Sequence, residues 1–231
     1  MTVTRRAVRI GAILSFCLFA LTALQYEKFL SMESGGIPML FAALAASLAV
    51  WPGVAVKLEK PGFFRFAAPI LLFLLVPLVM VIAVERLNGK FITQFLSGNE
   101  DLLENYVVCL LVYLLALGLT GSLRISILTV SPLLLLFGVA NMYVKEFKGG
   151  PLVPMDFGSI GTAWNVAAGY TYEIGCEIVF AAALTAMVMA LACRWSMPGL
   201  RLWGKLLLRG LCLLEVCGFR SEEHTSELQS L

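Results

Sequence analysis

The chain is 231 residues long, 60% hydrophobic and only 14% charged, with a formal net charge of +2 at pH 7. An ordinary soluble domain is about half apolar and about a quarter charged, and a disordered chain is more polar still. The composition excludes both classes. A chain of this size cannot hide so much apolar surface in its own core, so we expect it to fold within a lipid bilayer.

The last residues, 220–231, depart from this composition. They are polar and acidic, they follow an apolar run directly, and they resemble the translation of a widely used short-read sequencing adapter. We expect them to be a non-native tail, with a genuine polar tail as the alternative. The tail holds His224, the only histidine. Residues 1–219 contain no histidine, so histidine cannot serve as a catalytic group or metal ligand in them. We also expect the natural protein to continue beyond Phe219.

Charged residues divide the rest of the chain into apolar runs, most of them near the roughly 20 residues that a spanning helix needs. The sequence predicts an all-α, polytopic transmembrane helical bundle formed by residues 1–219. Six spans are expected at 10–26, 34–56, 66–84, 105–123, 125–144 and 178–193, and a truncated seventh at 206–219. A cleaved signal peptide is disfavoured as the first run, because no clear A-x-A site precedes Gln25.

Lysine and arginine are distributed unevenly between the predicted loops. The N-terminal segment and the loops that follow the second, fourth and sixth spans hold most of the basic residues and a single acid, Glu59. The intervening loops hold most of the acids. Because cytoplasmic loops carry the excess of Lys and Arg, the N-terminus is predicted to be cytoplasmic, and a completed seventh span would lead the chain outside.

The outer segment after the fifth span, residues 141–175, is too rich in Gly, Pro and polar residues to be a span. Gly149 and Gly150 are expected to end the preceding helix, and Pro151 and Pro154 to stiffen an extended piece. Asp156 can cap a helix. A short interfacial helix is therefore predicted within 145–175.

Two bases on the outer side, Lys145 and Lys148, depart from the charge rule. They suit contact with a lipid phosphate, but interfacial lysines that anchor a helix end are common and are the simpler alternative. Asp156 is equally a simple helix cap. Asn141 is expected to be a helix-end or interhelical hydrogen-bonding residue.

This segment resembles the membrane region of bacterial lipoteichoic acid synthase-like proteins, which are sulfatase-type phosphoglycerol transferases. The matching residues are Asn141, Tyr143, Val144, Phe147, Lys148, Gly149, Pro151, Leu152, Pro154 and Asp156, followed by Thr162, Ala163, Asn165, Val166, Ala167 and Tyr170. With Lys145, the motif residues Asn141, Tyr143, Lys148, Gly149, Pro151, Pro154, Asp156, Thr162, Asn165 and Tyr170 are candidate contacts for a lipid headgroup.

The resemblance implies an extracellular catalytic domain that this sequence lacks. In the family, a threonine nucleophile and a divalent metal, usually manganese, transfer glycerol phosphate from phosphatidylglycerol to a glycolipid or growing polymer. The family's nucleophile and metal ligands have no counterparts here, so no catalytic residue, metal ligand or cofactor is assigned to this sequence. The expected partners are membrane lipids, phosphatidylglycerol or a glycolipid among them, and no nucleic acid. The expected location is the bacterial plasma membrane.

Two other classes of function remain as alternatives. A lipid-linked glycosyltransferase would use an outer-loop carboxylate, and its candidates are Glu27, Glu33, Asp156 and Glu173; these loops contain no paired carboxylate motif. A transporter would show ionisable groups inside the spans or repeated broken helices. The six predicted spans contain no charged residue, and a transporter is therefore disfavoured. A scaffold membrane protein stays an open alternative.

Overall fold

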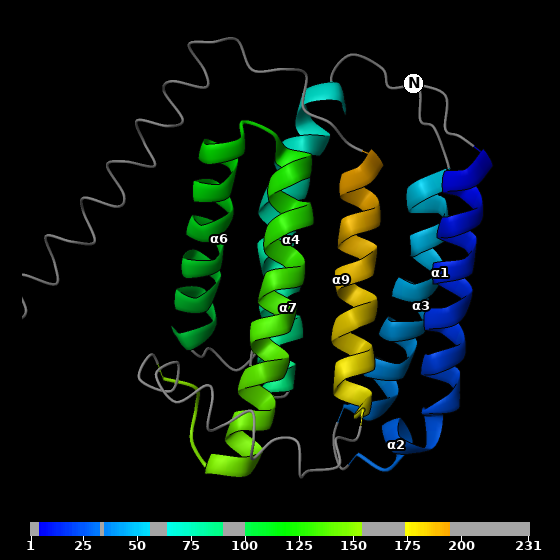
Figure 1. The fold of residues 1–231 in the computed structure, drawn as a ribbon, viewed down its shortest axis with the longest axis vertical. Coiled ribbons are helices and arrows are strands. Elements are labelled where there is room, and N and C mark those ends of the chain that lie inside the picture. The colour runs from blue at the N-terminus through cyan, green and yellow to red at the C-terminus, as the bar shows by residue number, and fades with distance from the viewer. Residues whose placement is uncertain (1–4, 33–34, 56–63, 90–99, 154–173, 195–231) are drawn as a thin grey trace, which may run out of the picture.

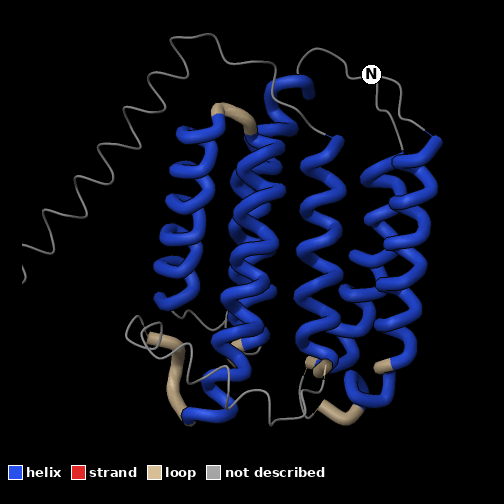
Figure 2. The backbone as a smooth tube through the Cα atoms, viewed as in Figure 1, coloured by secondary structure: helices blue, strands red, loops and turns tan. Residues whose placement is uncertain are grey.

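The computed structural model describes residues 5–32, 35–55, 64–89, 100–153 and 174–194. Its elements are all helices, namely α1 (Arg5–Leu24), α2 (Tyr26–Leu30), α3 (Gly36–Ala55), α4 (Phe64–Leu87), α6 (Glu100–Thr120), α7 (Leu123–Lys148) and α9 (Cys176–Arg194). The long helices run alternately up and down (Figure 1), and the described loops lie at the two ends of the bundle (Figure 2). For these residues the predicted all-helical bundle is confirmed.

Five of the described helices are long and apolar enough to cross a membrane, and they are α3, α4, α6, α7 and α9. In α1 the apolar stretch is Val8–Leu24, which is 17 residues long and shorter than a typical span. The described residues therefore support a multi-pass architecture, with five candidate spanning helices near the spans predicted from 34–56 to 178–193. The predicted seventh span, 206–219, lies outside the described residues.

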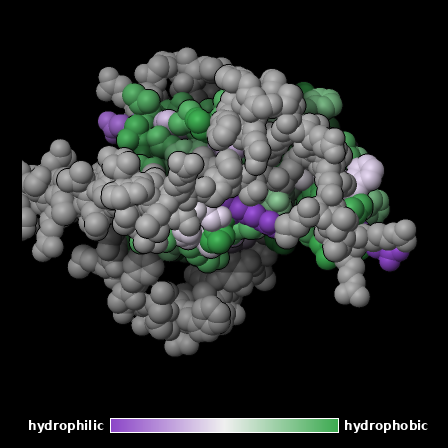
Figure 3. All heavy atoms as spheres, turned by 90° about the horizontal axis from the view of Figure 1, so that it is seen from above, coloured by the Kyte–Doolittle hydropathy of each residue, from purple (hydrophilic) through white to green (hydrophobic). Residues whose placement is uncertain are grey.

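The surface of the bundle is apolar along its helices. Large side chains such as Phe16, Phe41 and Leu119 are largely exposed, with 72% of the Phe16 side chain accessible. Where described residues are visible from above in Figure 3, most are hydrophobic. Patches of this extent are unfavourable in water, and a bilayer removes that cost.

Several helices end at other residues than the sequence suggested. The charged residues Glu85 and Arg86 were expected to lie in an outer loop, but α4 continues through both and ends at Leu87. Glu and Arg are good helix formers, and both side chains are buried, with 8% and 4% of their surfaces exposed. The inference that the spans carry no charge is therefore wrong, because the described candidate spans include charged residues, among them these two in the apolar helix Pro69–Leu87.

The other helix ends have local causes. The first helix stops at Leu24 because Gln25, with φ −99° and ψ 13°, leaves the helical conformation before α2 begins. At the far end of α7, Gly149 adopts the left-handed conformation at φ 74° and its N–H bonds the carbonyl of Lys145. This is the glycine stop that the sequence predicted, although α7 runs to Lys148 rather than to residue 144.

Small residues allow α9 to lie in the middle of the bundle, with α3 on one side and α4 and α7 on the other (Figure 1). A Cβ added to Gly53 of α3 would lie only 3.0 Å from the Cβ of Ala190 in α9. The buried alanines of α9 are Ala181, Ala183, Ala190 and Ala192. Helices in lipid associate through such close backbone approach, since burial of apolar surface gains little there.

Buried hydroxyl groups add cross-links between helices. The hydroxyl of Ser15 in α1 donates to the carbonyl of Ser47 in α3 over 2.7 Å. The hydroxyls of Tyr113 in α6 and Ser131 in α7 lie 2.7 Å apart and share one hydrogen bond. Each pair satisfies polar atoms that would otherwise be exposed to hydrocarbon.

We expect Gly53→Val to destabilise the bundle, because the added side chain must push α3 away from Ala190. Overpacking of this kind costs about 1–3 kcal/mol, which thermal unfolding of the detergent-solubilised protein will measure. The matched control is Ala45→Val on the exposed face of α3, where the change should stay within about 0.5 kcal/mol. Equal effects at both positions would contradict the proposed close contact.

Candidate functional site

The first half of the sequence motif lies at one end of the bundle, where α4 and α7 finish; we call this the motif end (Figure 1). Asn141, Tyr143, Lys145 and Lys148 lie in the last turns of α7, and Gly149 caps it. Pro151 follows in the described loop. The other candidates, Pro154, Asp156, Thr162, Asn165 and Tyr170, lie outside the described residues, as does most of the predicted interfacial helix.

Asn141 joins three parts of the chain at the motif end. Its side-chain amide donates to Oδ1 of Asn88, just after α4, over 2.6 Å. Its own Oδ1 accepts a hydrogen bond from the backbone N–H of Leu152, in the loop after α7, over 2.8 Å. Asn141 is thus the interhelical hydrogen-bonding residue that the sequence suggested, and it also holds the following loop against the bundle.

Lys145 reaches the same residue, Asn88, just after α4. Its Nζ donates to the backbone carbonyl of Asn88 over 2.9 Å, close to the C-terminus of α4. A cation there compensates the partial negative charge of the last helical carbonyls. The side chain thus connects the end of α7 to the residue that follows α4. This bond uses one of the three donors of the ammonium group.

Lys148 lies one turn further along α7 and is exposed. On the same stretch, the rings of Tyr143 and Phe147 stack with centroids 6.3 Å apart and planes inclined by 12°. Aromatic and basic side chains together are typical of the interface between a membrane and water. This part of α7 is chemically suited to meet lipid headgroups.

The segment between α7 and α9 is fixed at both of its described ends. Leu152 is bound by Asn141, and the carbonyl of Ile174, before α9, accepts a hydrogen bond from the side-chain amide of Gln25 over 3.0 Å. Gln25 occupies the break between α1 and α2. The loop that carries the second half of the motif therefore leaves and re-enters the bundle at defined points.

Sequence reasoning missed a polar pair between α4 and α6. The side-chain amide of Asn105 donates to Oε1 of Glu85 over 2.7 Å. Arg86, next in sequence, points to a different neighbour, and its Nη2 lies 3.0 Å from the sulfur of Met32. The sequence signal that could have revealed this pair is that Glu85 directly follows the apolar run 66–84. The prediction placed Glu85 in a loop, so this signal was not used.

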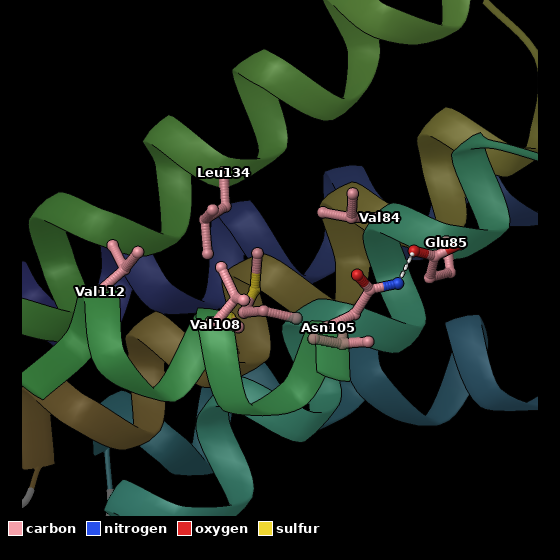
Figure 4. A pocket seen from close by; sticks show the side chains of 9 residues that line it. Val84, Glu85, Asn105, Val108, Val112 and Leu134 are labelled. Carbon is pink, nitrogen blue, oxygen red and sulfur yellow. Dashed lines mark hydrogen bonds between the residues drawn. The ribbon is translucent and has the colours of Figure 1, made fainter. Parts of the chain in front are cut away.

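The Glu85–Asn105 pair closes one end of a pocket of about 180 Å³ between α4 and α6, with α7 contributing one side chain (Figure 4). The lining is otherwise apolar apart from the thiol of Cys109 and the thioether of Met80. Its residues are Met80, Val81, Val84, Glu85, Asn105, Val108, Cys109, Val112 and Leu134.

The carboxylates proposed for a glycosyltransferase gain little support. Glu27 is described, on α2, where its Oε1 accepts a hydrogen bond from the hydroxyl of Tyr26 over 3.0 Å in an exposed setting. Glu33, Asp156 and Glu173 lie outside the described residues. Nor do the described residues fit the divalent metal that the family resemblance implies, because no three of their His, Cys, Asp or Glu side chains are placed to hold one.

We expect Asn141→Ala to weaken the motif end, because it removes the hydrogen bonds to Oδ1 of Asn88 and from the N–H of Leu152. The loss should be about 1–3 kcal/mol in unfolding free energy, with faster protease cleavage near residue 152. Thr129→Ala is the matched control on α7, since Thr129 is exposed and bonds only within its own helix. If cleavage near residue 152 does not accelerate in Asn141→Ala, the role assigned to Asn141 is wrong.

Comparison with known proteins assigns neither a family nor a function to the chain. No family model, no curated protein and no solved structure matches the chain. The resemblance of residues 141–172 to phosphoglycerol transferases accordingly stays a prediction.

Proposed function

We propose that the chain is the membrane part of an extracytoplasmic transferase of phosphoglycerol, or of a related phospho group, that acts in cell-envelope polymer synthesis. Its motif end handles the lipid substrate. The observation that carries the proposal is the arrangement around Asn141, in which residues of the motif tie the end of α7, the end of α4 and the following loop together. A basic and aromatic end that these hydrogen bonds hold together suits a platform for a lipid headgroup.

The proposal includes an orientation in the bacterial plasma membrane. The start of α1 and the α6–α7 turn share the end opposite the motif end (Figure 1), and these are segments in which the sequence concentrates Lys and Arg. By the positive-inside rule that end faces the cytoplasm and the motif end faces outward. Six spans and a seventh at 206–219 then lead to an extracellular catalytic domain.

The headgroup contact is assigned to Lys148. An ammonium group near a membrane surface attracts anionic lipid with about 1 kcal/mol. Lys145 contributes to the same field while it also binds Asn88. Phosphatidylglycerol is the expected lipid, and the divalent metal and the threonine nucleophile belong to the catalytic domain, as the resemblance implies.

The domain organisation is tested by reading the source DNA across the codon for Phe219 with long reads. The expected result is an open frame that continues through the seventh span into a domain with a candidate threonine nucleophile and Asp, Glu and His metal ligands. A frame that encodes residues 220–231 and then stops would overturn the proposed enzyme.

The headgroup contact is tested by Lys148→Gln. We expect the affinity of the purified protein for short-chain phosphatidylglycerol to fall about fivefold at low salt, which corresponds to about 1 kcal/mol, and the difference to shrink as salt screens the charge. Isothermal titration measures both. Lys28→Gln, on α2 and outside the motif, is the matched control; equal losses in the two variants would contradict a specific role for Lys148.

A further inference from the structure

The junction between the ends of α4 and α7 carries an inference about a residue that the sequence motif does not contain. We propose that Asn88 and Lys145 bind one phosphate group there, each donating a hydrogen bond to one of its oxygens. The group belongs to a lipid headgroup or is free phosphate, since both present the same oxygens. The inference rests on the proposed function for the role of the motif end, and it adds Asn88 as a binding residue.

One backbone group sets the direction of the hydrogen bonds at this junction. The N–H of Leu152 can only donate, so the atom of Asn141 that it meets is the oxygen, Oδ1. The amide nitrogen of Asn141 therefore faces Asn88 and donates to its Oδ1 over 2.6 Å. Because the oxygen of the Asn88 side chain is engaged in this way, the side chain presents its other atom, the amide nitrogen Nδ2, as a donor.

A second donor meets the same residue. The Nζ atom of Lys145 donates to the backbone carbonyl of Asn88 over 2.9 Å, and two of its three N–H groups remain. No described residue accepts a hydrogen bond from these two groups or from Nδ2 of Asn88. Lys145 is exposed, and Nδ2 is not among the buried atoms that lack a partner, so both nitrogens can be reached by a ligand.

The ends of the two helices hold these donors in place before a ligand arrives. Deeper in the bundle, a Cβ added to Gly138 would lie 3.0 Å from Cδ1 of Leu87, so α7 packs directly on the last residue of α4. The backbone N–H of Asn88 bonds the carbonyl of Val84, and Gly89 turns the chain away at φ 86°. Donors that are already positioned reduce the entropy that binding costs.

Charge and depth favour a phosphate at this junction. Asn88 directly follows the apolar span Pro69–Leu87, where the hydrocarbon core gives way to the headgroup region. Lys145 supplies a positive charge, and no described acid is bonded to either donor. A phosphodiester has one unesterified oxygen for each of the two nitrogens, and hydrogen bonds that involve a charged partner are roughly twice as strong as neutral ones.

The test removes the proposed donor while it keeps the bond between the helices. Asn88→Asp retains Oδ1 as the acceptor for Asn141 and replaces Nδ2 with a negatively charged oxygen. We expect the affinity of the purified full chain for short-chain phosphatidylglycerol, measured by isothermal titration, to fall about tenfold, which corresponds to about 1.4 kcal/mol. If Asn88 only joined the helices, the affinity would not change.

The matched control adds the same charge at the same end of the bundle. Ser31 is exposed and caps the end of α2, and Ser31→Asp should leave the affinity within about twofold, since salt screens a charge that makes no contact. An equal loss in Ser31→Asp and Asn88→Asp overturns the proposed site.

Titration with inorganic phosphate identifies the source of the group. If phosphatidylglycerol alone binds and Asn88→Asp weakens it, the site takes a lipid headgroup. If inorganic phosphate also binds and is weakened to the same extent, the site takes the free anion as well. Unchanged binding of both ligands in Asn88→Asp overturns the proposal.

Nuclear magnetic resonance follows the donor itself. In protein with isotope-labelled asparagine, the side-chain amide signal of Asn88, assigned through Asn88→Asp, should shift when phosphatidylglycerol is added, whereas the signal of Asn105, which is bonded to Glu85, should not. An unshifted Asn88 signal at saturating lipid overturns the contact.

Lys148→Gln separates this site from the headgroup contact of the proposed function. If Lys148→Gln retains its affinity for phosphatidylglycerol and Asn88→Asp loses it, the contact at Lys148 fails and the site at Asn88 stands. The reverse result overturns the site at Asn88 alone.

Discussion

The requirement that polar groups be satisfied inside the protein shapes the motif end more than any other constraint. In hydrocarbon each unpaired polar atom costs several kcal/mol, and α4 carries a buried acid, a buried base and an asparagine within its last residues and the one that follows. Asn105 of α6 donates a hydrogen bond to the acid, Glu85. Asn141 and Lys145 of α7 both donate hydrogen bonds to Asn88. These bonds fix where three helices meet, and through Leu152 they fix where the next loop begins.

The rest of the bundle is organised by close packing around α9. Alanine on α9 and glycine on α3 let the two helices approach until a Cβ on Gly53 would lie 3.0 Å from the Cβ of Ala190. The larger buried side chains form two groups, one around Tyr113 and Met80 and one around Phe29 and Phe180. Since α9 contributes to both, it couples the α1–α3 side of the molecule to the α4–α7 side that carries the motif and the pocket.

Two polar features lie at the motif end of the molecule. Lys148, Tyr143 and Phe147 lie on α7 at the interface, where charge and aromatic rings suit a headgroup. The pocket lies deeper between α4 and α6, and the Glu85–Asn105 pair closes one of its ends. The shared element is the C-terminal part of α4, because Glu85 faces the pocket and Asn88 faces α7. A change in this part of the helix would reach both features.

The sequence by itself determined the helical class, the approximate position of each described spanning helix and the stop at Gly149, because hydrophobic length and a left-handed glycine are local properties. It also identified Asn141 as a hydrogen-bonding residue, but not its partners. Only the tertiary structure decided that Glu85 and Arg86 remain in α4 and are buried, since the bond from Asn105 depends on a helix distant in sequence. For the same reason Asn88 and the pocket were invisible to pattern analysis: a pocket is a relation between helices, and no single run of residues records it.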